Sequence, residues 1–403
     1  MRLTHGQLMC SALTQKGVYM HIAIIGAGMA GLAAAQALRE RMPDAIVTIY
    51  EKSRGFGGRV ATRRRENYAF DHGAQVIKNP SPAVVRLLTQ ELEASALRRM
   101  ELPVWTFDAA GTIAEGDDTA NVEASYFYTA GNNQVGKLLA EGLNVQRAVR
   151  ITAITQLDGG AGGRWQLIDD QRQQIGTADV VLFTPPAPQI IDILTASALP
   201  DELRDRLSAE LRRASYRRCL SVALAYDRLV ARPFYALLNT DRQHPISWLA
   251  LEHAKGSERC PPGHSLLIAQ MAPQWSVDQY DTPIEQLAPA VAALVSGVLG
   301  EDLDAPLWAD LQRWRYALPD TGCDFATLNQ QGAQHGLFFA GDFVAGRGRV
   351  HLAIERGWDV AALIAQISAL RMIASHHQNG VTPSHHPRSN RPPGYAGGTG
   401  TGV

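Results

Sequence analysis

The order of apolar and polar residues near the start of the chain predicts short strands that alternate with a helix. An apolar run over 21–25 predicts a strand, and the small-residue stretch after it predicts a helix to about Arg41, before Pro43. A second run over 46–50, rich in β-branched and aromatic residues, predicts another strand that ends at Glu51. Strand, helix and strand in this order are typical of the α/β fold class.

A glycine-rich turn joins the first strand to the helix. Its residues follow the pattern Gly-x-Gly-x-x-Gly, in which Gly26 permits a tight turn, Gly28 lets the backbone approach a pyrophosphate, and Gly31 lets the helix lie close to the strand. The helix N-terminus offers free N–H groups to the phosphates. Glu51 follows Gly26 by 25 positions, near the spacing at which an acid accepts hydrogen bonds from an adenosine ribose. Together these features predict a Rossmann-type domain that binds a dinucleotide.

A second glycine turn, Gly57-Gly58-Arg59, follows the acid and favours FAD over NAD. A longer ligand needs such a turn because its pyrophosphate and ribityl chain run on past the adenosine, and the planar fork of an arginine suits phosphate. The neighbouring residues 63–65 fit either a solvated basic loop or a role at the ligand. The candidate cofactor contacts in this part of the chain are Gly26, Gly28, Met29, Ala30, Gly31, Glu51, Lys52, Gly58 and Arg59.

The run KSRGFGGRVATRR, followed by Asp71-His-Gly-Ala-Gln75, resembles the flavoprotein amine-oxidase superfamily and, within it, the renalase-like branch. The resemblance implies that Ala74 and Gln75 lie beside the flavin. His72 is open to two interpretations, an acid/base group or a structural residue, and a lone histidine in a turn is more often structural. Further cofactor contacts that the resemblance implies are Val149 against adenine, Gly341 and Asp342 near the ribityl or phosphate region, and Val350 in the final helix.

The resemblance also implies two domains, one of them discontinuous. The expected FAD-binding domain covers 20–76, 142–190 and 336–372, and an inserted antiparallel-sheet α+β substrate domain covers 77–141 and 191–335. Residues 1–19 are expected to be a disordered leader. Residues 375–403 are expected to be a disordered tail, because they are rich in Pro and Gly and poor in apolar residues.

The substrate candidates lie in the flavin turn and in two other stretches. Residues 126–134 form a polar turn that opens a helix and either borders the substrate cavity, by resemblance, or acts as a plain helix cap. Residues 312–319 resemble the renalase-like motif His-Arg-Trp-x-Tyr-Ala, with Gln312 in place of the histidine. Their aromatic side chains either wall an aromatic substrate site or pack in the core. The substrate candidates are Gln75, Asn132, Asn133, Trp314 and Tyr316, with Gly131 beside them in the polar turn.

The final segment departs from the family's pattern at two positions. Where the family has Arg-Val-Glu-Gly-Ala, this chain has Arg349-Val-His-Leu-Ala353. His351 therefore replaces an acid with a potential cation. Leu352 places bulk where the flavin and the helix are expected to come close.

Composition narrows the function classes. The chain has 38 Lys and Arg against 39 Asp and Glu, a net charge of −1, so neither nucleic acid nor an acidic membrane surface is an expected partner. Its four cysteines form no Cys-x-x-Cys pair, which argues against a disulfide framework or a cysteine zinc site and fits a reducing cytoplasm. The long uncharged run over residues 17–38 contains the glycine-rich turn and is predicted as a strand and a helix, so no membrane-spanning helix of roughly 20 residues is expected. No metal site is expected either.

The chain contains no Gly-x-Ser-x-Gly elbow, no phosphate loop of the Gly-x-x-x-x-Gly-Lys-Ser/Thr type and no His-Glu-x-x-His helix. Catalysis is therefore expected to reside in the flavin, without an assigned catalytic side chain. The cysteine motif of covalent flavin attachment in the family is also missing, which predicts noncovalent FAD.

The resemblance implies a cytoplasmic FAD-dependent oxidoreductase that is similar to bacterial renalases. Those enzymes oxidise dihydronicotinamide isomers of NAD(P)H and use O2 as the acceptor. Two alternatives stay open: an amine, carotenoid or porphyrinogen oxidase or desaturase of the same superfamily, and a flavin-binding protein without turnover.

Overall fold

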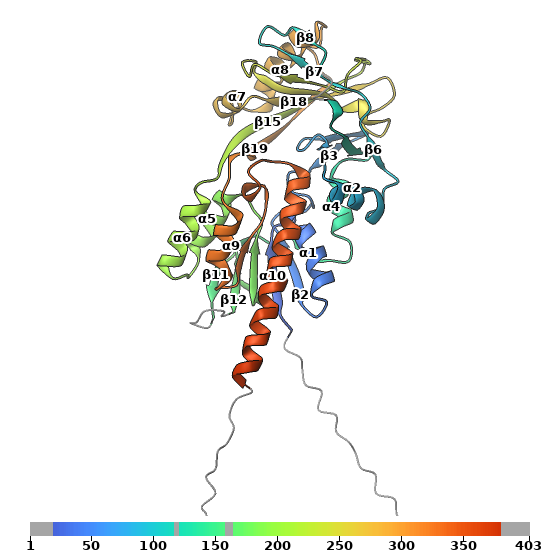
Figure 1. Ribbon diagram of the computed structural model, residues 1–403. Coiled ribbons are helices and arrows are strands. Elements are labelled where there is room, and N and C mark those ends of the chain that lie inside the picture. The colour runs from blue at the N-terminus through green and yellow to red at the C-terminus, as the bar shows by residue number, and fades with distance from the viewer. Residues whose placement is uncertain (1–18, 117–120, 158–163, 380–403) are drawn as a thin grey trace, which may run out of the picture. The chain divides into compact units, whose positions relative to one another are not determined.

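A computed structural model describes residues 19–116, 121–157 and 164–379 of the chain. The predicted leader, apart from Tyr19, and the predicted tail beyond Asn379 lie outside the described residues. Contacts divide the chain into two units, Met1–Ala365 and Gln366–Val403. Every sheet belongs to the first unit (Figure 1).

A five-stranded parallel sheet is the centre of the predicted cofactor-binding part. Its strands follow the order β10-β2-β1-β14-β20, and each neighbouring pair is parallel. The strands are β1 (His21–Ile25), β2 (Ile46–Glu51), β10 (Asn144–Arg147), β14 (Val180–Phe183) and β20 (Leu337–Phe339), and α1 (Met29–Arg41) connects β1 to β2. The predicted Rossmann-type α/β fold is confirmed. The exact boundaries of the two domains stay a prediction.

The middle strands of this sheet are buried, which explains their continuous apolar sequences. Phe183 and Phe339 stack in the core on one side of the sheet, with ring centroids 5.4 Å apart, and Trp165 belongs to the same buried cluster. A three-stranded antiparallel sheet and three helices complete this core. They are β11 (Ile151–Gln156), β12 (Trp165–Asp169), β13 (Gln174–Ala178), α5 (Ala187–Ala196), α6 (Asp201–Leu211) and α9 (Phe325–Ala333).

A seven-stranded sheet forms the predicted substrate part, in the order β19-β15-β18-β17-β16-β7-β8. Its strands are β7 (Val104–Phe107), β8 (Ile113–Ala114), β15 (Ser215–Tyr226), β16 (Ala236–Asn239), β17 (Ile246–Leu251), β18 (Ser265–Met271) and β19 (Trp308–Thr321). The expected antiparallel pairing is wrong for one pair, because β16 runs parallel to β7. β7 arrives from an earlier part of the chain and not through a hairpin, so no tight turn imposes an antiparallel direction.

One face of the seven-stranded sheet packs against the helix α8 (Ile284–Leu299). β15 and β19 are unusually long, at 12 and 14 residues. In Figure 1 they run from the seven-stranded sheet to the region of α5, α6 and α9. Trp314 and Tyr316 therefore lie in the middle of a strand that reaches both parts of the fold.

The remaining elements of the first unit are short. β3 pairs with β4, and β9 lies between β5 and β6. These elements are β3 (Thr62–Arg65), β4 (Tyr68–Asp71), β5 (Ile77–Lys78), β6 (Leu97–Arg99), β9 (Ser125–Tyr128), α2 (Pro82–Arg86), η1 (Leu87–Glu91), α4 (Asn133–Leu139), η2 (Glu252–Lys255), α7 (Pro273–Asp278) and η3 (Asp342–Val344).

The last helix, α10 (Val350–Asn379), extends past residue 372, where the expected FAD-binding domain ends. The expectation that the tail is non-helical from residue 375 is therefore wrong for 375–379. These residues contain neither Gly nor Pro, and the first helix-breaking residue is Gly380.

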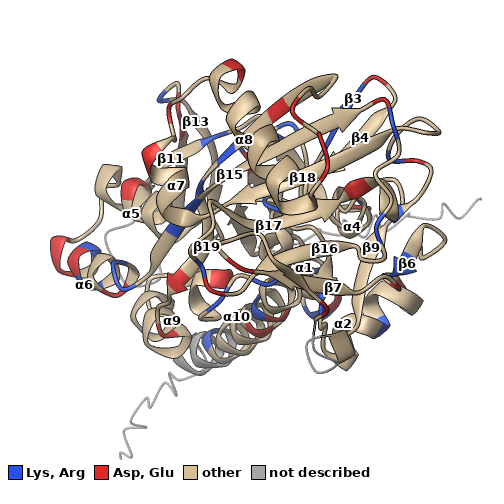
Figure 2. Cartoon of the chain, turned by 90° about the horizontal axis from the view of Figure 1, so that it is seen from above, with Lys and Arg blue, Asp and Glu red and all other residues tan. Residues whose placement is uncertain are grey.

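Acidic and basic residues are mixed along the elements and not separated by sign (Figure 2). α6 is an example, since Arg206 pairs with Glu202 one turn away, at 3.2 Å. Within the described part of the chain, no helix has both the length and the apolar character that crossing a bilayer requires.

Candidate functional site

The first glycine turn has the geometry that a bound pyrophosphate requires. Gly26 has φ +103°, and its N–H donates to the carbonyl of Tyr50 at 2.8 Å. A Cβ at Gly31 would lie 2.1 Å from the carbonyl oxygen of Gly26, so the helix approaches the strand only because this residue is glycine. A Cβ at Gly28 would meet nothing within 4 Å, which leaves space before the N-terminus of α1 for a phosphate.

Glu51 lies at the end of β2 as the sequence predicts and is only 7% exposed. Its Oε2 accepts the N–H of Ala27 at 2.7 Å, and its Oε1 accepts the N–H and the hydroxyl of Ser53 at 2.8 and 2.6 Å. A carboxylate offers about four acceptor positions, so one remains for a ribose hydroxyl. Lys52 is exposed and bonded to Gln189 at 2.8 Å. The N–H of Val149 donates to the Glu51 carbonyl at 3.0 Å, which brings Val149 beside this acid.

The second glycine turn packs against the first. Gly57 has φ +100°, and its N–H donates to the carbonyl of Ala27 at 2.9 Å. Arg59, which the sequence favours as a phosphate contact, instead forms a two-pronged ion pair with Asp342, at 2.7 and 2.8 Å. The same guanidinium donates to the carbonyl of Tyr316 at 3.2 Å. Two predicted cofactor residues that are 283 positions apart thus meet.

The turn from Asp71 to Gln75 is held at every carbonyl by a side-chain donor. The Nε1 of Trp314 donates to His72 at 2.8 Å, and the Nε2 of Gln270 donates to Gly73 at 2.8 Å. The Nδ2 of Asn132 donates to the Ala74 and Gln75 carbonyls at 3.0 and 2.8 Å, and the Nε2 of Gln75 donates to Asp71. The donors come from three different elements, so the turn is fixed from several sides.

Two polar side-chain atoms in this turn are buried without a hydrogen-bond partner among the described residues: Nδ1 of His72 and Oε1 of Gln75. Buried polar atoms are nearly always paired in native proteins. A ligand that supplies hydrogen-bond partners to these two atoms is a physical reason for leaving them free. Together with the space before Gly28, this fits the predicted flavin and its substrate.

His72 is neutral at physiological pH. Burial is the main cause, and the nearby Arg63 adds to it; together they lower the pKa of His72 to about 4 against the opposing effect of Asp71. Its ring stacks on Trp314 with centroids 5.6 Å apart and an interplanar angle of 17°. The stacking and the neutral state favour a positional role over that of an acid.

The remaining substrate candidates divide into two groups. The side chain of Asn132 is fully buried and bonded to backbone on both its nitrogen and its oxygen, so it positions the turn and has no free group for substrate. Asn133 has a buried Oδ1 without a partner among the described residues. Tyr316 contacts Tyr216 edge-on, with centroids 5.5 Å apart. Trp314 lies against His72. With Asn132 excluded, the remaining substrate candidates are Gln75, Asn133, Trp314 and Tyr316.

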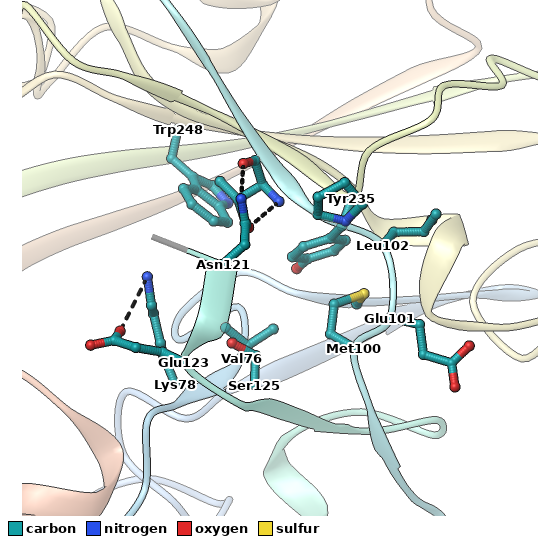
Figure 3. A pocket seen from close by; sticks show the side chains of 12 residues that line it. Val76, Lys78, Met100, Glu101, Leu102, Asn121, Glu123, Ser125, Tyr235 and Trp248 are labelled. Atoms are coloured by element: carbon teal, nitrogen blue, oxygen red, sulfur yellow. Dashed lines mark hydrogen bonds and ion pairs between the residues drawn. The ribbon is translucent and has the colours of Figure 1, made fainter. Parts of the chain in front are cut away.

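A pocket of about 110 Å³ lies directly beyond the turn, because Val76, which follows Gln75, is in its wall (Figure 3). Tyr235 and Trp248 form an edge-on aromatic pair there, with centroids 6.2 Å apart. The hydroxyl of Tyr235 reaches the Gln75 carbonyl at 3.5 Å, and Nε1 of Trp248 is buried without a partner among the described residues. The other lining residues are Lys78, Met100, Glu101, Leu102, Pro103, Val104, Asn121, Glu123 and Ser125.

The surroundings of His351 disfavour the cationic form that the sequence left open. Burial is the largest influence and lowers the pKa of this imidazole. It lies in the first turn of α10, directly after Val350. The replacement of the family's acid therefore removes a negative charge, and burial disfavours a positive charge in its place.

Cysteine thiols offer no reactive thiolate in the described part of the chain. Cys219, Cys260 and Cys323 are free, and burial raises the pKa of Cys219 and of Cys323 to about 12. No cluster of three or more His, Cys, Asp or Glu side chains within 19–116, 121–157 and 164–379 is placed to hold a metal ion.

The sequence interpretation missed a cluster of four charged residues beside the turn. Asp71, Glu252, Lys255 and Arg259 are fully buried and paired with one another. The available signal was weak, because only the segment 252–259, with four charges of alternating sign, is unusual in sequence.

Comparison with known families agrees with this geometry. Residues 24–90 match an NAD(P)-binding Rossmann-like domain, and residues 108–365, more than half of the chain, match the flavin containing amine oxidoreductase family. The chain belongs to this flavin-containing amine oxidoreductase family. Membership confirms the predicted superfamily and the enzyme class, a flavin-dependent oxidoreductase. The renalase-like branch stays a prediction.

Solved structures of oxidases share the fold of this family member. A putative protoporphyrinogen oxidase from Exiguobacterium sp. 255-15 superposes with a TM-score of 0.67 at 18% identity, over 86% of this chain and 99% of that one. Cyclohexylamine oxidase from Brevibacterium oxydans IH-35A gives 0.65 at 15% identity, over 87% and 100%. At these identities the likeness establishes the fold alone.

Among curated proteins, 4,4'-diapophytoene desaturase from Staphylococcus aureus (strain Newman) is 39% identical over 61 residues. This match covers 15% of the chain and only 12% of the desaturase. The chain therefore matches only a small part of the desaturase's length.

Proposed function

We propose that this family member is an oxidase that binds FAD noncovalently and oxidises a small planar hydride donor of the dihydronicotinamide class, with O2 as acceptor. The observation that carries the proposal is the convergence of distant segments. The turns at Gly26 and Gly57 are joined through Ala27, and Arg59 is joined to Asp342. A long ligand such as FAD needs contacts from both glycine turns and from the segment of Asp342.

The residues of the chain would hold the cofactor in distinct ways. The N-terminus of α1, with open space at Gly28, suits the pyrophosphate, and Glu51 keeps an acceptor for the ribose. FAD, when bound, supplies the hydride-accepting ring. The buried, protonated thiols and the absence of the family's cysteine motif support noncovalent attachment.

The substrate side of the proposal rests on Gln75, His72 and the aromatic residues of β19. The unpartnered Oε1 of Gln75 is an acceptor for an N–H donor such as a carboxamide, and Nδ1 of neutral His72 accepts or donates according to its tautomer. Trp314 and Tyr316 offer flat surfaces for a planar ring. A dihydronicotinamide becomes aromatic when it loses hydride, so the protein needs no general base, in agreement with a His72 whose pKa is about 4.

We propose the pocket of Figure 3 as the path by which substrate reaches the turn, since it connects to Gln75 through Val76 and Tyr235. Trp248→Phe keeps the aromatic ring and removes the unpartnered donor. The expected result is a KM raised severalfold with kcat within twofold of wild type. Unchanged KM would contradict this path.

The experiment that tests the function starts from the purified full chain and its visible spectrum. Flavin bands that are released on acid precipitation support noncovalent FAD. Anaerobic addition of dihydronicotinamide isomers should bleach the bands, and air should restore them with release of peroxide. If amines or porphyrinogens bleach the bands and dihydronicotinamides do not, the result supports the amine- or porphyrinogen-oxidase alternative.

A yellow protein that no donor reduces would instead support the non-catalytic flavin-binding alternative. A colourless protein that stays colourless with excess FAD would refute the proposal. The free cysteines support a reducing compartment, so we also propose the cytoplasm as the location, which cell fractionation can test.

A further inference from the structure

Four charged side chains form a closed network in the interior. Asp71, Glu252, Lys255 and Arg259 are each 0% exposed. The Nζ of Lys255 lies 2.8 Å from Asp71 and 2.9 Å from Glu252, and Arg259 lies 3.0 Å from Asp71 and also pairs with Glu252. The two acids and two bases balance, so the network is buried without a net charge.

The network joins the flavin turn to the seven-stranded sheet. Asp71 is the last residue of β4 and the first residue of the turn that contains Ala74 and Gln75. Glu252 and Lys255 belong to η2, which follows β17 directly. The backbone N–H of Asp71 also donates to Glu252, at 3.0 Å. The end of β17 therefore holds the start of the turn.

Stability alone is a poor reason for such a network. Desolvating two ion pairs is costly, and well-packed apolar residues of similar volume are often as stable or more so. Charged networks of this kind are best attested where they impose one specific arrangement. Asp71 illustrates this, because its Oδ1 additionally accepts the N–H of Asn132 at 2.9 Å, and Asn132 in turn holds the Ala74 and Gln75 carbonyls.

Lys255 is closed off from solvent. Its ammonium is paired with two carboxylates and lies 5.7 Å from the centroid of the Tyr235 ring. Lys255 therefore acts through the residues that it holds.

We propose that the cluster of Asp71, Glu252, Lys255 and Arg259 is a positioning device that fixes the 71–75 turn against the flavin. The proposal rests on the proposed function, because it takes Ala74 and Gln75 as flavin contacts. Loss of one member leaves a buried charge without its partner, and the start of the turn moves. The donors Gln270 and Trp314 then no longer meet the carbonyls of the turn together.

The test compares Lys255→Met with Leu224→Ala, using the full chain reconstituted with FAD. Leu224 is fully buried in β15, in the core that α8 covers, and its truncation destabilises the same sheet without touching the turn. Kd for FAD is measured by flavin fluorescence titration at an equal interval below the melting temperature of each variant. The visible circular dichroism of bound flavin is recorded alongside.

We expect Lys255→Met to raise the Kd for FAD at least tenfold and to change the flavin dichroism. Leu224→Ala should lower the melting temperature while Kd stays within twofold of wild type. Wild-type Kd and dichroism in Lys255→Met would overturn the proposal. If Lys255→Met does not fold, Glu252→Gln, which keeps the size of a cluster member and removes its charge, must weaken FAD binding or alter the dichroism, and failure to do either overturns the proposal equally. Failure of the wild-type protein to bind FAD would instead refute the proposed function.

Discussion

Glu51 serves both the protein and the predicted ligand with one carboxylate. Its Oε2 fixes Ala27 inside the glycine turn, and its Oε1 fixes Ser53. An acid at this position thus organises the backbone on which the cofactor is expected to rest. The sequence identified Glu51 from its spacing, and the structure adds the intramolecular bonds.

Replacing Glu51 by Ala removes these charge-assisted hydrogen bonds, which are worth about 1.5–3 kcal/mol each. We expect the Kd for FAD to rise roughly 10- to 100-fold, as measured by fluorescence titration. Glu40→Ala, at an exposed position in the helix α1, is the matched control and should bind FAD like wild type. Equal Kd values for the two variants would contradict the assignment of Glu51.

His72 gives the protein a specific pH dependence. Its pKa falls from 6.5 in the unfolded chain to about 4 in the folded one, mainly through burial. Between these values the unfolded chain binds more protons, so stability is complete above pH 6.5 and is lost as the pH falls below it.

Between pH 7.5 and pH 5, wild type should lose about 2 kcal/mol more unfolding free energy than His72→Gln. Urea denaturation of both proteins at the two pH values measures this difference. An equal loss in both proteins would show that His72 is not buried in its neutral form.

At the scale of elements, α10 and α1 meet at a glycine. A Cβ at Gly357 would lie 2.4 Å from the carbonyl oxygen of Ala30 and 3.0 Å from the backbone nitrogen of Ala34. Because both neighbours are backbone atoms of a helix, neither can move aside easily. The crossing keeps α10 close to the helix whose N-terminus is the predicted pyrophosphate site.

Gly357→Ala should therefore lower stability by about 1–3 kcal/mol, as overpacking does, although Ala is normally the better helix residue. Gly297→Ala is the matched control, since a Cβ there meets nothing within 4 Å in the helix α8. It should raise stability by about 0.5–1 kcal/mol. Thermal unfolding of both variants tests the opposite signs, and a stabilised Gly357→Ala would disprove the tight crossing.

At the scale of the whole molecule, the early loop and the final segment are joined by the ion pair of Arg59 and Asp342. Asp342 is almost fully buried, and Arg59 also donates to the carbonyls of Tyr316 and Ala317 in β19. This one guanidinium therefore links the second glycine turn, the long strand β19 and η3. Binding of FAD along this line is expected to couple to global stability.

FAD at 100 times its Kd should stabilise wild type by about 2.7 kcal/mol, seen as a higher melting temperature. In Asp342→Asn the ion pair is lost, so we expect a lower melting temperature without FAD and less than half of the wild-type shift at the same FAD concentration. Asp359→Asn removes an exposed ion pair with Arg356 in α10 and is the control. If FAD raises the melting temperature of Asp342→Asn as much as that of wild type, this ion pair does not contribute to cofactor binding.

Local patterns sufficed for the start of the Rossmann part. The first glycine turn was recognisable because Gly26 has φ +103° and because a Cβ at Gly31 would collide with the carbonyl oxygen of Gly26. The direction of β7 and the burial that lowers the pKa of His351 were not predictable, because both depend on neighbours that are distant in sequence.

The sequence by itself determined the α/β fold class, the two glycine turns and the acid that follows them, since steric demands and hydrophobic periodicity act over a few residues. Only the tertiary structure decided that Arg59 pairs with Asp342 and that Asn132 donates to the carbonyls of the 71–75 turn. It also decided that Asp71 meets three other buried charged residues. The physical reason is that ion pairs and side-chain hydrogen bonds need specific partners within about 3 Å, and folding brings these partners from positions that no local pattern connects.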